Sequence, residues 1–167
     1  MLVDFESLKP HSRVWIYHSK RKFTPEEKDI ISEYLSSFTS DWKAHGIPLT
    51  ASFEIMLDAF IVLAVDEEAY GASGCSIDGS TRAIKELEEK LDLGLFDRGK
   101  ASFVRGEELH TVSLKQLKET AEAGEWNAET PSINTLVATK GELDSAFVVP
   151  AGATWLRRYL PRAPISH

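Results

Sequence analysis

The chain has 167 residues, 43% hydrophobic and 27% charged, which is typical of one soluble folded domain rather than of a disordered or membrane protein. Its net charge of −7 disfavours nucleic acid unless a basic patch is present, and its single cysteine excludes an intrachain disulfide and an all-cysteine metal site. The longest apolar run, Ala59 to Val65, is far shorter than the ~20 residues of a membrane span, and the acidic start is unlike a signal peptide. A single cytoplasmic domain over residues 1–167 is therefore expected.

The first strand and helix are predicted from the stretch before residue 48. "RVWIYHS" (Arg13 to Ser19) is rich in β-branched and aromatic residues, which indicates a strand. Thr24 and Pro25 supply a capping hydroxyl and a proline at the first helical position, and acids follow them. Gly46 and Pro48 are expected to end this helix. Its buried face is predicted to carry Ile31, Leu35, Phe38 and Trp42.

Two more strands and a second helix follow. In "SFEIML" (52–57), Phe53, Ile55 and Leu57 alternate with Glu54 and Met56, as in a strand with one buried face. "FIVLAV" (60–65) is apolar throughout, which predicts a central strand buried on both faces. After a glycine-rich loop, the spacing of Ile84, Leu87 and Leu91 predicts a helix that Gly94 ends.

The last third is less regular. "ASFVRGEELHTVS" (101–113) indicates two short strands joined at Gly106. Ser113 and Gln116 form a capping-box pattern for a helix to about Gly124. Further helical pieces are expected after Thr139 and Thr154.

The order β-α-β-β-α-β over about residues 11–105 predicts an α+β fold, a ferredoxin-like sandwich whose helices cover one face of an antiparallel sheet. That topology places its first and third strands in the middle, which agrees with the apolar third strand. Residues 106–167 are expected to add a C-terminal hairpin and a helical extension.

The loop "GASGCSIDGST" (Gly71 to Thr81) carries the strongest functional signal, because it joins the most buried strand to a helix N-terminus, where free amides favour an anion. The loop resembles a phosphate-binding loop, but Ser80 occupies the lysine position, so ATP hydrolysis is not expected. It differs from a cysteine phosphatase loop too, because six residues rather than five separate Cys75 from Arg82. The favoured hypothesis is a small-ligand or anion site over Gly71–Ser80. Its ligand-binding residues would be Arg21, Ser73, Gly74, Ser76, Asp78 and Arg98, with the two arginines as counter-charges.

A second hypothesis is a thiol-dependent enzyme with Cys75 as the catalytic residue. A helix N-terminus lowers a thiol pKa, and His18 or His110 would be the base. The alternative is a small buried Cys75, with Ser76 or Asp78 as the N-cap. No cofactor is expected. The histidines show no H-x-x-x-H spacing, so no metal site is predicted.

A third hypothesis is a nucleic-acid or protein binding module on the segment from Trp15 to Phe23. Basic residues interleave there with aromatic ones, a pattern that can stack bases and contact phosphates. The aromatic residues could equally pack beneath the C-terminal extension. The net charge disfavours nucleic acid without excluding it, no membrane contact is expected, and the oligomeric state is left open.

The motifs "WIYHSKRKF", "GASGCSID" and "LFDR" together resemble a family of small uncharacterised bacterial proteins of about this length, whose members are sometimes labelled "ABC transporter ATPase". The resemblance extends over nearly the whole chain and implies a fingerprint but no mechanism. The residues that match it are Trp15, Tyr17, Ser19, Arg21, Phe23, Gly71, Ser73, Gly74, Cys75, Ser76, Asp78, Asp97 and Arg98.

Overall fold

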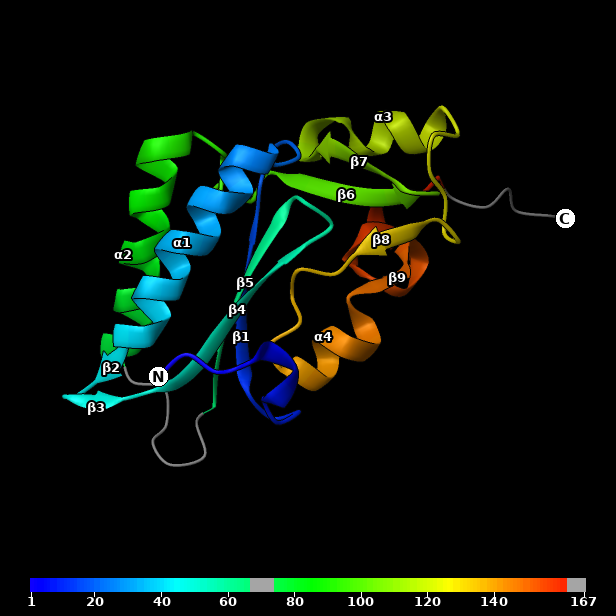
Figure 1. Cartoon of the computed structure of the whole chain (residues 1–167). Helices are drawn as coiled ribbons and strands as arrows, with labels where there is room; N and C mark the ends of the chain where they lie inside the picture. The colour runs from blue at the N-terminus through cyan, green and yellow to red at the C-terminus, as the bar shows by residue number, and fades with distance from the viewer. Residues whose placement is uncertain (67–73, 162–167) are drawn as a thin grey trace, which may run out of the picture. The chain divides into compact units, whose positions relative to one another are not determined.

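The chain divides into two units in the computed structural model, which describes residues 1–66 and 74–161 and leaves out the side chains of residues 74–76. Unit 1 comprises Met1–Asp97 and Thr135–Ser145, and unit 2 comprises Arg98–Asn134 and Ala146–His167. Each unit has a β-sheet of its own, and each is described by itself (Figure 1).

Unit 1 combines an antiparallel sheet with two long helices. Its strands are β1 (Arg13–His18), β2 (Lys43–Ala44), β3 (Ile47–Pro48), β4 (Thr50–Met56) and β5 (Phe60–Asp66). Its helical segments are η1 (Phe5–Ser7), α1 (Pro25–Asp41), α2 (Gly74–Leu91) and α4 (Lys140–Ala146), the last of which ends at the unit boundary.

The main sheet of unit 1 has the strand order β1-β5-β4, with both pairings antiparallel. The central strand is β5, and its residues Phe60 to Val65 are all buried, which confirms the prediction from the apolar run. Trp15 lies opposite Leu63, and Leu63 lies opposite Phe53, so these three side chains share one face of the sheet. Helices α1 and α2 cover that face with Ile31, Leu35, Ile84 and Leu87.

The opposite face of this sheet is covered by the start of the chain and by residues 135–145, which lie on the other side of the strands from α1 and α2 (Figure 1). The Lys140 N–H donates to the Ser12 carbonyl at 2.8 Å, and the Gly141 N–H donates to the Pro10 carbonyl at 2.8 Å. The Lys140 ammonium lies 5.8 Å from the centre of the Phe5 ring. These contacts explain why the central strand is buried on both faces.

The α+β class is confirmed, but the ferredoxin-like topology is not. Only three of its four predicted strands share a sheet, because β6 (Lys100–Arg105) pairs with β7 (Glu108–Ser113) and β8 (Pro131–Ile133) instead. At the outer edge of β1, the Val14 N–H donates to the Ala138 carbonyl, and Arg13 forms an isolated antiparallel bridge with Thr139. A late segment therefore occupies part of the edge that the topology gives to the fourth strand.

Helix α1 begins as predicted and ends earlier. The Thr24 hydroxyl accepts from the Glu27 N–H, and the Glu27 carboxylate accepts from the Thr24 N–H, which completes a capping box. The helix stops at Asp41, with Trp42 as its C-cap. The predicted end at Gly46 and Pro48 is wrong, because these residues belong to the β2–β3 hairpin, where His45 and Gly46 both have positive φ, as a tight hairpin turn requires.

Unit 2 contains a second antiparallel sheet of order β7-β6-β8-β9, in which β9 is Val148–Pro150. Its helical segments are η2 (Leu114–Gln116), α3 (Leu117–Glu122), η3 (Ala151–Ala153) and η4 (Trp155–Tyr159). The core stacks the rings of Phe103 and Trp126, whose centres are 4.8 Å apart at an interplanar angle of 24°. The predicted hairpin at Gly106 is present as β6 and β7.

The helical predictions for the last third are confirmed in part. The capping box at Ser113 is absent: its side chain makes no capping hydrogen bond, and the segment begins as a 3-10 turn before α3. The predicted pieces after Thr139 and Thr154 are α4 and η4. In each case the threonine hydroxyl accepts from a backbone N–H, of Glu142 and of Leu156 respectively.

Candidate functional site

Helices α1 and α2 run antiparallel along the sheet. The Tyr34 hydroxyl of α1 donates to the Glu86 carboxylate of α2, and eight residues further along α1, Trp42 lies against Gly79, earlier in α2. Residue numbers thus rise along one helix as they fall along the other. The C-terminal end of α1 is therefore beside the first turns of α2, the helix that the glycine-rich loop precedes.

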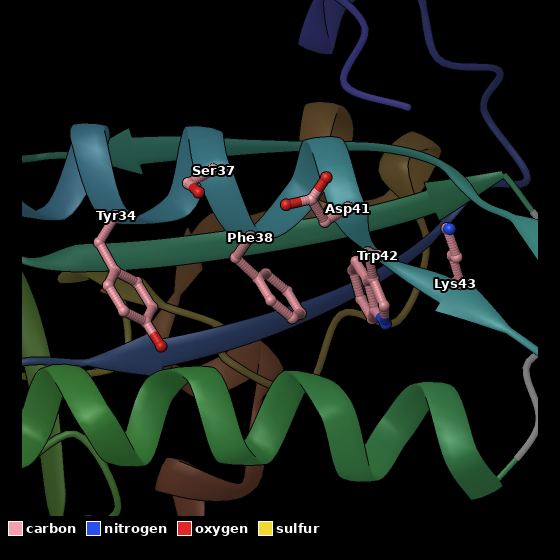
Figure 2. Close-up of a pocket in the computed structure, with 6 residues that line it drawn as sticks. All are labelled: Tyr34, Ser37, Phe38, Asp41, Trp42 and Lys43. Atoms are coloured by element: carbon pink, nitrogen blue, oxygen red, sulfur yellow. The ribbon is translucent and has the colours of Figure 1, made fainter.

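A groove of about 400 Å³ opens at this end of α1. It is lined by Tyr34, Ser37, Phe38, Asp41, Trp42 and Lys43. Figure 2 shows the rings of Tyr34 and Phe38 pointing from α1 toward α2, with Ser37 and Asp41 in front of the α1 ribbon. The lining therefore combines aromatic faces with hydroxyl groups, one carboxylate and one ammonium group.

Trp42 is the most buried of these residues, with 3% of its surface exposed. Its ring centre lies 4.9 Å from that of Phe38 and 5.9 Å from that of Trp15, both in tilted arrangements. Its indole Nε1 is buried and has no hydrogen-bond acceptor among the residues that the structure describes. A buried donor without an acceptor costs about 1–3 kcal/mol, so this nitrogen requires an explanation.

The indole nitrogen faces α2 at Gly79 (Figure 2). A Cβ atom at Gly79 would lie 3.4 Å from Nε1 and 3.8 Å from Cδ1 of Trp42, and no other contact of that position within 4 Å is found in the described part of the chain. A methyl group at Gly79 would thus be in ordinary van der Waals contact with the indole, so α2 packs closely against Nε1 and the protein itself shields this nitrogen.

The structure describes only the last residues of the predicted anion loop, from Gly74 onward. Residues Gly71 and Ser73 lie outside the described residues, and α2 begins at Gly74, so Cys75 and Ser76 are in its first turn. The interpretation of Ser76 or Asp78 as the N-cap is wrong, because both residues lie inside the helix. Asp78 is exposed.

Ser80, which occupies the lysine position of a phosphate-binding loop, is fully buried in α2. Its hydroxyl donates to the Ile77 carbonyl at 2.7 Å. This hydroxyl is therefore engaged with its own helix and is not presented to a phosphate.

Arg21 forms an ion pair with Glu27. Its two terminal nitrogens donate to the Glu27 carboxylate at 2.6 and 2.8 Å. The hydrogen bond from Arg21, opposed in part by desolvation, lowers the pKa of Glu27 to about 2, and Glu27 in turn raises the pKa of Arg21. Arg21 thus stabilises the capping box of α1.

Arg21 and His18 lie at or beyond the end of β5 that is opposite to Asp66, the residue after which the predicted loop follows. His18 pairs with Phe60 at the start of β5, whereas the loop follows Asp66 at the other end of that strand, about 20 Å away. His18 is buried and stacks on Phe60 with ring centres 4.4 Å apart. The hypotheses of Arg21 as a counter-charge and of His18 as a base for Cys75 are therefore not supported.

Asp97, Arg98 and His110 lie outside α2. Asp97 belongs to the turn after α2, where its N–H donates to the Gly94 carbonyl at 3.1 Å, a helix length of about 27 Å from Gly74. Arg98 follows it as an exposed residue at the start of unit 2, and His110 lies in β7 of the same unit.

The segment predicted to bind nucleic acid or protein is part of the core of unit 1. Trp15 and Tyr17 pack against the core cluster beneath α1 and α2. The Ser19 hydroxyl donates to the Arg21 carbonyl at 2.6 Å, and Phe23 is buried. The spacing of the W-I-Y-x-S-x-R-x-F motif is therefore accounted for by packing and by the turn into α1.

Sequence reasoning missed Tyr34, Ser37, Asp41 and Lys43 as groove residues. Trp42 was assigned to the buried face of the first helix; it is buried, but it lies at the C-cap, after the helix ends at Asp41. Nothing in the sequence indicates that its nitrogen lacks an acceptor, and Gly79 was placed in the glycine-rich loop rather than in the helix.

The described residues include neither a metal-binding cluster nor a membrane-spanning helix. No cluster of three or more histidine, cysteine, aspartate or glutamate side chains is arranged to hold a metal ion in the described ranges. Within the same ranges, no helix has the length and apolar character needed to cross a membrane.

Comparisons with protein-family models, with curated proteins and with solved structures gave no significant match. The resemblance noted from the sequence motifs therefore stays a prediction.

Proposed function

We propose that this protein binds a small molecule in the groove at the C-terminal end of α1. The observation that supports this proposal is the lining of the groove, which combines the rings of Tyr34, Phe38 and Trp42 with hydroxyl groups and one charge of each sign. A concave site with aromatic surface and a few polar groups is typical of ligand binding. The predicted anion loop ends in the same region, with Gly74 and Ser76 in the first turn of α2.

Binding is favoured over catalysis by the chemistry of the lining. The six groove residues supply aromatic surface, hydroxyl groups and one charge of each sign, and they include neither a histidine nor a cysteine. Such a lining can orient a ligand by stacking and hydrogen bonding. It does not present a nucleophile beside a base, which covalent catalysis requires.

The test is to block the groove with a larger side chain at a position of α1 that lines it. Ser37 is exposed and lines the groove, whereas Ser40 is exposed on the same helix and does not line it. Ser37→Phe should abolish binding of groove ligands found by screening a fragment library with ¹⁵N NMR, while Ser40→Phe should bind as the parent protein does. The indole N–H signal of Trp42, assigned by its loss in Trp42→Phe, is the reporter.

Two results would count against the proposal. One is a screen in which no fragment shifts the Trp42 signal. The other is a set of ligands that bind equally well to the Ser37→Phe and Ser40→Phe variants, because such ligands would occupy another site.

A second candidate is thiol chemistry at Cys75, favoured by its place as the second residue of an 18-residue helix. The positive end of the helix dipole stabilises a thiolate. Iodoacetamide kinetics from pH 5 to 9 would show a midpoint well below ~8.5 for an activated thiol. A thiol that titrates near ~8.5, or that does not react, would remove this candidate.

A further inference from the structure

We infer that residues 135–145 form a pH-sensitive strap, which binds the sheet of unit 1 more tightly in mildly acidic solution than at neutral pH. The inference goes beyond the proposed function, because the strap lies on the face of the sheet opposite to α1 and its groove (Figure 1). The observation that supports it is a group of four carboxylates, from the start of the chain, from β4 and from the strap, around one buried ammonium.

The strap is held on the sheet by backbone hydrogen bonds to a segment far away in the sequence. The Lys140 N–H donates to the Ser12 carbonyl at 2.8 Å, and the Val14 N–H donates to the Ala138 carbonyl at 2.9 Å. Both ends of the strap continue into unit 2, so its release would leave a single covalent connection between the units, the one after Asp97. The strap can open without separating the main sheet, because β1, β4 and β5 all precede it in the chain and pair with one another.

Glu54 of β4 lies on the face of the sheet that the strap covers. It is opposite Val62, which in turn is opposite Ile16, so these three side chains share a face. Successive side chains of a strand point to opposite faces, and the neighbouring residues Phe53 and Leu63 belong to the face beneath α1 and α2. Glu54 therefore places a carboxylate among apolar side chains, where its ionised form is disfavoured.

The Lys140 ammonium is buried among more negative charge than it can balance. Its Nζ lies 3.2 Å from the Asp144 carboxylate and 4.0 Å from the Glu6 carboxylate. Asp4 and Glu54 complete the group, so four carboxylates share this one ammonium in the described part of the chain. Of the four acids, Glu54 is half-buried and the other three are exposed. Glu54 is therefore the group whose protonation relieves the most repulsion.

The electrostatics of Glu54 give the direction of the pH effect. Burial raises the pKa of Glu54, and the carboxylates of Glu6 and Asp144 raise it further, with Lys140 acting in the opposite direction. With the strap docked, Glu54 thus binds a proton more readily than with the strap released, where it has the ordinary pKa of 4.5. Docking therefore strengthens as the pH falls from 7 to 4.5, and this gain is lost as the pH rises again through the raised pKa.

The experiment measures hydrogen exchange of the strap in the full chain. The amides of Lys140 and Gly141 report on docking, because they donate to the carbonyls of residues 12 and 10. Their protection factors, corrected for the intrinsic exchange rate at each pH, should rise a few-fold from pH 7 to pH 4.5. The amide of Leu63, in the central strand β5, is the reference for opening of the whole unit and should change less.

Three variants assign the effect. Glu54→Gln keeps the shape of the side chain and removes its charge, so it should raise strap protection at pH 7 to the acidic value and abolish the pH dependence. Glu33→Gln, at an exposed position of α1, is the matched control and should behave as the parent protein does. His11→Gln removes the imidazole that lies 3.5 Å from the Asp66 carboxylate and gains charge in the same pH range, and in it the pH dependence should persist.

Lys140→Met removes the ammonium and retains an apolar stem. It should lower strap protection at pH 7 and make the pH dependence steeper, because the carboxylates then repel one another without compensation. If this variant does not fold, Glu54→Gln still tests the inference.

Three results would overturn the strap. They are protection of the Lys140 and Gly141 amides that does not vary with pH in the parent protein, a pH dependence that survives in Glu54→Gln, and an equal rise at Leu63. The last would mean that the whole unit responds to pH and that the strap does not open by itself.

Discussion

Two buried tryptophans, one in each unit, differ in the hydrogen bonding of the indole N–H. In unit 2, Trp126 Nε1 donates to the Leu117 carbonyl at 3.2 Å and is 3.0 Å from the Thr120 hydroxyl. In unit 1, Trp42 is as deeply buried, but no acceptor is found for its Nε1 in the described residues. The first indole has its hydrogen bond satisfied within the core, and the second is buried without an acceptor among the described residues.

Two glycines, one in each unit, differ in the room around them. The position of a Cβ at Gly152 in unit 2 lies 2.8 Å from the Ala128 Cβ, whereas at Gly79 in unit 1 the nearest atom is 3.4 Å away, an ordinary contact distance. A side chain is therefore excluded at Gly152 and tolerated at Gly79.

The largest effect is expected at Gly152. Gly152→Ala should lower the free energy of unfolding by ~2–3 kcal/mol, because the new methyl group would overlap Ala128 and the backbone would have to shift. Gly79→Ala should leave it unchanged or raise it by up to ~1 kcal/mol, since alanine favours a helix. Urea unfolding of both variants measures the contrast, and equal losses would contradict it.

The tryptophan pair should give the next largest difference. Trp126→Phe and Trp42→Phe remove the same ring atoms, but only the first breaks hydrogen bonds. We expect Trp126→Phe to cost ~1–3 kcal/mol more than Trp42→Phe in chemical unfolding. A larger loss in Trp42→Phe would mean that its nitrogen has an acceptor in solution.

The sequence was sufficient to predict the local elements and insufficient for the sheet partners. The apolar stretch 60–65, Thr24 with Pro25, and the spacing of Ile84 and Leu87 each specify a strand or a helix by local chemistry, and those predictions are confirmed. The strand 100–105 was correctly identified but given to the wrong sheet. Its partners lie in β7 and in β8, and pairing with residues 131–133 is a distant contact that no local pattern encodes.

The candidate site was predicted even less well, because burial, pairing and an unpaired nitrogen are properties of the fold. The motif W-I-Y-x-S-x-R-x-F suggested stacking and anion binding, yet Trp15, Tyr17 and Phe23 pack in the core and Arg21 binds Glu27. Arginine and glutamate six residues apart do not face each other on a regular helix, so this ion pair depends on the turn before α1. No sequence pattern pointed toward the groove.

Glu27 of unit 1 contrasts with Trp42, because its carboxylate accepts hydrogen bonds from Arg21 and from the Thr24 N–H. Because the pKa of Glu27 is lowered to about 2 in the folded protein, its stabilising effect is fully present above the ordinary value of 4.5 and is lost as pH falls through about 2. Glu27→Gln should therefore cost ~1 kcal/mol at pH 7, and the difference from the parent protein should vanish toward pH 2. Urea unfolding between pH 7 and pH 2 measures this difference.

The exposed Glu26, in the same first turn, is the control for Glu27. Glu26→Gln should change stability much less at every pH. A pH-independent difference between Glu27→Gln and the parent protein would show that the charge on Glu27 does not stabilise the cap.

The smallest effect is expected at Tyr34, whose hydroxyl bridges α1 to Glu86. Burial, with a smaller contribution from the bond to Glu86, raises the pKa of Tyr34 to about 12. This bond stabilises the folded state below pH 10 and is lost as pH rises through about 12. Tyr34→Phe should cost ~0.5 kcal/mol at pH 7. Absorbance titration should show that the variant lacks one of the four tyrosines, the one that ionises near pH 12; a titration unchanged by the substitution would contradict the assignment.

The return of residues 135–145 to unit 1 has a consequence for synthesis on the ribosome. The face of the sheet that carries Val14, Phe60 and Val62 is completed only by a segment that follows 37 residues of unit 2, Arg98 to Asn134. Until residue 145 has left the exit tunnel, that apolar face is covered only by the start of the chain, and the nascent chain displays the rest of it to chaperones. Truncation after residue 97 should accordingly yield an aggregating fragment, although every strand of the first sheet would be present.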